Sequence, residues 1–140
     1  MLAISDKELY VAGLFLYWGE GNKASRHTVS VSNTDPNVLI FTLNWMVNSL
    51  GIPKEKIKAS LQLYSDMDET KLISFWSKTL QIPKKQFNKS YIKESTRASI
   101  DQHGFGFGTC SISAQSTVIK ENLLMAIKAI SDNYAQKKVI

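Results

Sequence analysis

The segment from Leu9 to Trp18 is apolar or aromatic at every position, so a helix formed by it has no polar face. Just before it, Ser5 and Glu8 have the spacing of a capping box, in which each side chain binds a free backbone amide of the other residue. We therefore predict a helix over about residues 6–18, ended by the glycines on either side of Glu20. A helix that is apolar all round must be covered on all sides.

The need to bury every side of this helix predicts how the chain assembles. In a domain of this size a sheet covers one side of a helix, and a second copy of the helix is the simplest cover for the other side. We therefore expect a homodimer; the alternative is a helix buried at the centre of one monomer. The apolar run is about half the length that a bilayer requires, so no membrane partner is expected. The expected dimer-interface residues are Leu9, Ala12, Gly13, Phe15 and Leu16.

The whole chain, residues 1–140, is expected to form a single domain. A chain of this length buries roughly two-thirds of its unfolded surface without disulfides or a structural metal. Cys110 is the only cysteine, which excludes an intramolecular disulfide and a multi-cysteine zinc site. Because no apolar leader follows Met1, we expect a protein of the reducing cytoplasm.

The rest of the chain alternates between strand and helix patterns. Residues 50–60 and 80–90 also repeat one unit, a helix end, an Ile-Pro-Lys turn and a strand. The glycines of residues 104–108 do not match a phosphate-binding loop. This order favours an α+β fold with helices on one face of a sheet and the other face open. The expected strands are 28–32, 57–64, 87–92 and 104–112, and the further helices are 36–50, 68–80 and 116–135.

Positive charge is concentrated in one segment. The chain has a formal net charge of +5, and the segment from residue 84 to residue 97 contains Glu94 as its only acid. A polyanion such as nucleic acid is the natural partner of such a segment; the alternative is a solvated lysine face. Its basic residues are Lys84, Lys85, Lys89, Lys93 and Arg97.

Glu20 is the strongest candidate for a chemical role. His27 and His103 stand outside any catalytic motif, and no metal-ligand spacing is present. Glu20 lies at the carboxyl end of the apolar helix, where the helix dipole disfavours an anion and favours a nearby cation. Two such helices side by side would bring two copies of Glu20 together, and Mg²⁺ is the expected bridging cation. The alternative is a solvated glutamate in a helix-ending turn.

The segment from Gly13 to Gly21, Gly-Leu-Phe-Leu-Tyr-Trp-Gly-Glu-Gly, resembles the signature helix of the LAGLIDADG homing endonucleases, which ends in a small residue, an acid and a glycine. The resemblance implies a homodimer with these helices at its seam and a saddle-shaped antiparallel sheet on double-stranded DNA. It also implies a metal-bound acid at Glu20, next to Gly19. Trp18 stands at the family's other aspartate position.

With this resemblance, the leading hypothesis is a homodimeric, Mg²⁺-dependent, site-specific DNA endonuclease. One alternative is a DNA-binding regulator on the same fold that does not cleave, and another is a dimeric interaction module without a nucleic-acid role. The polar faces of the strands would contact the major groove. The candidate contacts, besides the basic segment, are Thr28, Ser30, Ser32, Lys58, Ser60, Gln62, Tyr64 and Tyr91.

Overall fold

The computed structural model describes residues 3–94 and 106–135, and its elements follow the predicted order of helices and strands. Two short 3₁₀ turns, η1 (Lys54–Lys56) and η2 (Lys84–Gln86), precede the second and third strands. The helices are α1 (Asp6–Glu20), α2 (Pro36–Asn48), α3 (Glu69–Leu80) and α4 (Thr117–Ala135). The strands are β1 (Thr28–Asn33), β2 (Lys58–Tyr64), β3 (Tyr91–Lys93) and β4 (Thr109–Gln115).

The four strands form one mixed sheet in the order β1-β4-β2-β3. Strand β4 pairs antiparallel with both β1 and β2, whereas β2 and β3 are parallel. The prediction of a fully antiparallel sheet, which the family resemblance implied, is therefore wrong at the edge formed by β3. The chain crosses from β2 to β3 through α3, and a helical crossover returns the next strand in the same direction.

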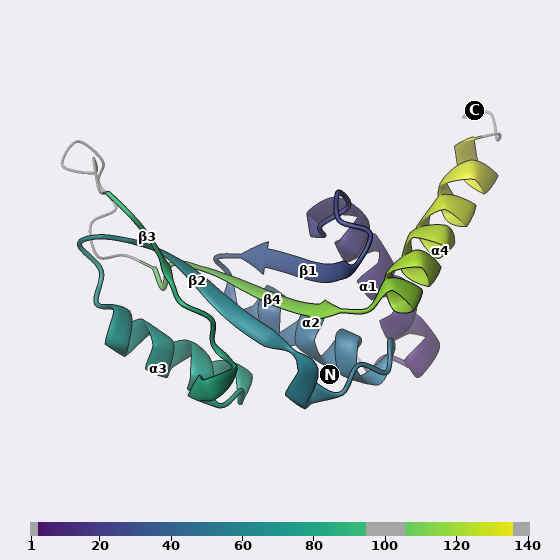
Figure 1. Ribbon diagram of the computed structural model, residues 1–140. Helices are drawn as coiled ribbons and strands as arrows, with labels where there is room; N and C mark the ends of the chain where they lie inside the picture. Colours follow the sequence, from purple (N-terminus) through teal and green to yellow (C-terminus); the bar gives the residue numbers. More distant parts are fainter. Residues whose placement is uncertain (1–2, 95–105, 136–140) are drawn as a thin grey trace.

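The two faces of the sheet differ in burial. Alternate residues of β1, β4 and β2 are buried, and helices α2 and α3 run beneath that face (Figure 1). The core includes Trp45 and Met46 of α2 and Trp76 and Leu80 of α3. This confirms an α+β fold, in which α2 and α3 cover one face of the sheet (Figure 1). The buried strand residues are Val29, Val31, Ala59, Leu61, Leu63, Cys110, Ile112 and Ala114.

Helix α1 is covered on one side within the chain. Its capping box is present: Glu8 N–H donates to Ser5 Oγ at 3.1 Å, and Ser5 N–H donates to Glu8 Oε1 at 3.0 Å. Gly13 is buried against α2, where an added Cβ would overlap the indole of Trp45. Placing Gly13 at a dimer interface is therefore wrong, because its missing side chain allows α1 to approach α2.

The third and fourth strands start later than expected. Phe87 makes only an isolated bridge to Ala59, and the expected strand 87–92 reduces to β3. The expected strand 104–112 is replaced by β4, because Gly106 and Gly108 have φ of 80° and 75°, which strands do not use. Residues 104 and 105 lie outside the described residues.

The internal repeat is confirmed as structure. Pro53 and Pro83 stand at equivalent positions before η1 and η2, and the chain after each turn joins the sheet. Gln86, buried in the second copy, donates from Nε2 to the backbone oxygens of Lys54 at 3.0 Å and Ile57 at 2.7 Å in the first. The two copies therefore hold each other in register beneath the start of β2.

Candidate nucleic-acid interface

The face of the sheet opposite α2 and α3 is a polar surface built from the unburied residues of all four strands. Because directly paired residues share a face, the pairing register defines its rows. We call it the open face. Its rows are Thr28–Gln115, Ser30–Ser113–Lys58, Ser32–Ser111–Ser60, Thr109–Gln62–Tyr91 and Tyr64–Lys93.

The register also decides which way β3 points. Tyr91 pairs with Gln62 and Lys93 with Tyr64, so both β3 residues lie on the open face. Tyr91 is 59% exposed. Tyrosine and lysine thus stand at one end of the open face, Lys58 stands towards the other end, and small hydroxyl side chains lie between them.

The open face carries lysines and no acidic residue from its described strands. None of the four strands as described contains an aspartate or glutamate, whereas Lys58 and Lys93 both lie on this face. The central hydroxyls are organised: the Oγ atoms of Ser32 and Ser111 lie 2.5 Å apart, and Asn88 Nδ2 donates to Ser60 Oγ at 3.2 Å. Each hydroxyl can donate or accept, so the centre of this face suits the mixed donors and acceptors of base edges.

Part of the basic segment lies away from this face. Lys84 and Lys89 line a hollow of about 350 Å³ beside Glu69 and Ile73 of α3, on the helix side of the sheet edge. Lys85 is exposed on η2, and Arg97 lies outside the described residues. Of the basic segment as described, the structure therefore brings only Lys93 onto the open face.

Glu20 is the last residue of α1 and is exposed. The next residue, Gly21, forms an isolated bridge with Val31, and Asn22 N–H donates to Ser30 O at 2.8 Å. The carboxylate is therefore carried at the β1 edge of the sheet, one residue before the chain joins it. The helix runs two residues further than predicted and includes Gly19.

A buried lysine that the sequence analysis missed anchors the turn after Glu20. Lys120 of α4 is fully buried, and its Nζ donates to Tyr17 Oη at 3.0 Å, to Thr28 O at 2.5 Å and to Asn22 O. Tyr17 Oη in turn donates to Asn22 O at 2.6 Å and accepts from Ser30 N–H at 3.2 Å. All three ammonium protons are thus satisfied by uncharged oxygens.

The environment of this network shifts both ionisable groups. Burial raises the pKa of Tyr17, partly offset by the hydrogen bond from Ser30 N–H. Burial, followed by the charge of Lys23, lowers the pKa of Lys120. Both shifts favour the uncharged forms, as expected when no carboxylate compensates a buried charge. The sequence signal was the position of Lys120 three and seven residues before Leu123 and Ile127, on the apolar stripe of its helix.

One chain supplies only Glu20 and Gly19 as the metal ligands that the resemblance implies. Carboxylate and carbonyl oxygens, such as those of Glu20 and Gly19, are the donors that Mg²⁺ prefers. Within the described ranges, however, no group of three or more His, Cys, Asp or Glu side chains is placed to hold a metal ion. A metal site at Glu20 would therefore need donors from a second copy or from a bound phosphate.

The outer side of α1 is apolar and exposed. Phe15 is 52% and Trp18 is 40% exposed, and together with Ile130 and Tyr134 of α4 they line a groove of about 430 Å³. We call it the α1/α4 groove. Of the other expected interface residues, Ala12 is exposed, while Leu9 and Leu16 are half-buried.

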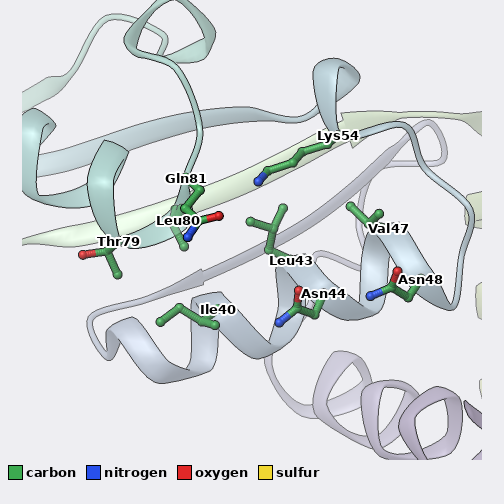
Figure 2. A pocket seen from close by; sticks show the side chains of 9 residues that line it. All are labelled: Ile40, Leu43, Asn44, Val47, Asn48, Lys54, Thr79, Leu80 and Gln81. Atoms are coloured by element: carbon green, nitrogen blue, oxygen red, sulfur yellow. The ribbon is translucent and has the colours of Figure 1, made fainter.

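A separate hollow of about 330 Å³ lies in the helix layer, where the ends of α2 and α3 face η1 (Figure 2). Asn44, Asn48, Lys54 and Gln81 surround it, together with apolar side chains such as Leu43. Its lining contains no carboxylate, histidine or cysteine from the described chain, so it offers no acid, base or nucleophile of the usual kinds.

Comparison with known proteins adds no family. No protein-family model, no curated protein and no solved structure matches the chain. None of the helices within residues 3–94 and 106–135 has the length and apolar character needed to cross a membrane.

Proposed function

We propose that this protein binds double-stranded DNA through the open face of its sheet. The observation that carries the proposal is a strand surface without acids, on which Lys58 and Lys93 flank a centre of hydroxyl groups. Lysines bind phosphates and position a protein, whereas hydroxyl and amide groups read base edges. A β-ribbon fits the major groove, so neighbouring strands such as β4 and β2 can enter it.

We further propose that the binding unit is a homodimer joined through the α1/α4 groove. Phe15 and Trp18 lie on the uncovered side of a helix that has no polar face, and the groove beside them has an almost entirely apolar lining. A two-fold axis there would give the dimer two equivalent open faces and would match a near-palindromic DNA site. The resemblance of residues 13–21 to the LAGLIDADG helix points to the same seam.

Cleavage of the bound DNA is the proposed activity. In a dimer the two Glu20 carboxylates would hold Mg²⁺ at the β1 edges of the two sheets, beside the bound backbone. When bound, Mg²⁺ polarises the scissile phosphate, lowers the pKa of water and stabilises the leaving oxygen. Glu20 would hold the ion, and the lysines of the open face would keep the phosphate backbone in place.

A DNA-binding regulator that does not cleave is the second candidate. It is favoured by the single carboxylate at the end of α1 and by the lack of a metal-ligand group within the described chain. Glu20→Gln separates the two functions, since it keeps the shape of the side chain but removes its charge and one of its two acceptor oxygens. For an endonuclease we expect Mg²⁺-dependent nicking to disappear while DNA binding persists; normal nicking by E20Q would refute the assignment of Glu20.

DNA binding itself is tested by fluorescence anisotropy with a labelled duplex over a series of salt concentrations. Affinity should fall as salt rises, and the double variant Lys58→Ala/Lys93→Ala should lower the salt slope by about 2, since each phosphate contact contributes about 0.9. The matched control is Lys54→Ala/Lys78→Ala, which removes two lysines of the helix layer. Equal losses in both variants would contradict a role for the open face.

A further inference from the structure

A hollow of about 720 Å³ lies where β2 begins, β4 ends and α4 begins. Lys58 and Ser113, which form a cross-strand pair of the open face, are part of its wall. Another part of the wall comes from η1 and the residue before it, through Lys56 and Pro53. The hollow therefore adjoins the proposed DNA surface. We call it the end pocket.

The lining of the end pocket combines two kinds of chemistry. Lys56 and Lys58 are exposed ammonium groups at its rim, and Asn88 and Gln115 add side-chain amides that can both donate and accept hydrogen bonds. Apolar surface comes from residues such as Ile119. Among the described residues that line it there is no aspartate or glutamate. The pocket thus suits an anion joined to a flat apolar group with a polar edge.

We infer that the end pocket receives one unpaired nucleotide of the DNA bound on the open face. A nucleotide combines a phosphate for the two lysines, a flat base for the apolar wall and a hydrogen-bonding edge for the amides. The volume falls within the range of roughly 300–1,000 Å³ typical of small-ligand sites. A base that is stacked and paired within a duplex cannot enter such a pocket. This inference rests on the proposed function.

The test compares two duplexes of the same sequence, one fully paired and one with a single extra nucleotide bulged from one strand. Because the bulged base is already unpaired, its entry does not require a base pair to open, and we expect the bulged duplex to bind about tenfold more tightly. With 2-aminopurine as the bulged base, bound protein should also protect its fluorescence from quenching by acrylamide.

The matched variants are Lys56→Ala and Lys54→Ala, which remove the same charge from the two ends of η1. Lys56 lines the end pocket, whereas Lys54 lines the hollow between α2 and α3 (Figure 2). Lys56→Ala should reduce the preference for the bulged duplex to about threefold or less, as expected when one phosphate contact is lost, and Lys54→Ala should leave it unchanged.

The possible results separate the inference from the proposed function. Equal affinity for the two duplexes would overturn the inference while the proposed DNA binding stands. Equal effects of the two lysine variants would also overturn it, because the preference would then not come from the end pocket. If neither duplex binds, the proposed function fails and the inference fails with it.

Discussion

The ammonium nitrogen of Lys120 lies 3.0 Å from the phenolic oxygen of Tyr17, and this contact joins the last helix to the first. The same ammonium group holds the backbone oxygens of Asn22 and Thr28, so it links α4, α1, the turn after Glu20 and the start of β1. The hydrogen bonds of Lys120 therefore fix the turn that follows Glu20, the proposed metal-binding carboxylate at the end of α1.

Lys120→Met should destabilise the protein by about 1–3 kcal/mol, because it removes this donor from the Tyr17 hydroxyl and from two half-buried carbonyl groups. The measurement is the free energy of unfolding in urea. Lys128→Met is the control on the same helix: its ion pair with Asp132 is exposed, and such pairs contribute at most about 1 kcal/mol. Equal effects of the two variants would show that the Lys120 network contributes no particular stability.

Gly13→Ala and Gly19→Ala should have opposite effects although both lie in α1. A Cβ at Gly13 would overlap Trp45, and overpacking of this kind costs about 1–3 kcal/mol. A Cβ at Gly19 meets nothing within 4 Å, and alanine in a helix is up to about 1 kcal/mol more favourable than glycine. Thermal unfolding followed by circular dichroism measures both. A stable Gly13→Ala protein would contradict the packing of α1 on α2.

Cys110 should resist alkylation in the folded protein. Burial raises the pKa of its thiol from 9.0 to about 12, so the reactive thiolate is scarce at pH 8.5. Iodoacetamide should therefore modify Cys110 slowly in buffer and quickly in urea. Rapid modification of the folded chain would place Cys110 at an accessible surface instead.

The same thiol makes a defined contribution to the pH dependence of stability. The unfolded chain loses the thiol proton above about pH 9, while the folded chain keeps it up to about pH 12. Since the folded state binds the extra proton in this interval, the contribution is complete below pH 9 and is lost as the pH rises towards 12. The free energy of unfolding in urea, measured between pH 9 and 12, should therefore fall less steeply with pH in Cys110→Ala than in the wild-type protein.

Phe15→Glu should convert a dimer into a monomer. The phenyl ring is half exposed in the α1/α4 groove, and a buried unpaired charge at an interface is strongly unfavourable. Light scattering coupled to gel filtration measures the change in mass, and circular dichroism checks that the variant folds. Met125→Glu, at an exposed α4 position outside the groove, is the control and should keep the wild-type mass. A wild-type protein that is monomeric at all concentrations would exclude the proposed seam.

The local elements could be predicted because their signals lie within a few residues of each other. The capping box of Ser5 and Glu8 starts α1, and the caps at Asp35 and Asp68 accept from Asn37 N–H and Lys71 N–H at the starts of α2 and α3. The alternation of residues 28–32 defined β1 and its polar side. The candidate contacts of β1 and β2 consequently lie on the open face, as their alternation indicated.

Strand pairing and contacts between distant segments could not be predicted from such local patterns. No local signal reveals that the first strand pairs with the last, or that β3 is parallel to β2, since these pairings depend on how the helices cross the sheet. The orientation of Tyr91 and Lys93 follows from that register. The burial of Lys120 likewise depends on oxygens supplied by residues far away in the sequence.

The amino-acid sequence by itself determined the helix starts, the turns at Pro53 and Pro83, and the division of the sheet into a polar and an apolar side. These follow from the conformational preferences of single residues and from the period of side chains along one element. Only the tertiary structure decided which lysines share a surface, which side of α1 stays uncovered and what holds the turn after Glu20. Those outcomes depend on packing between segments that are distant in the chain, and no local preference encodes them.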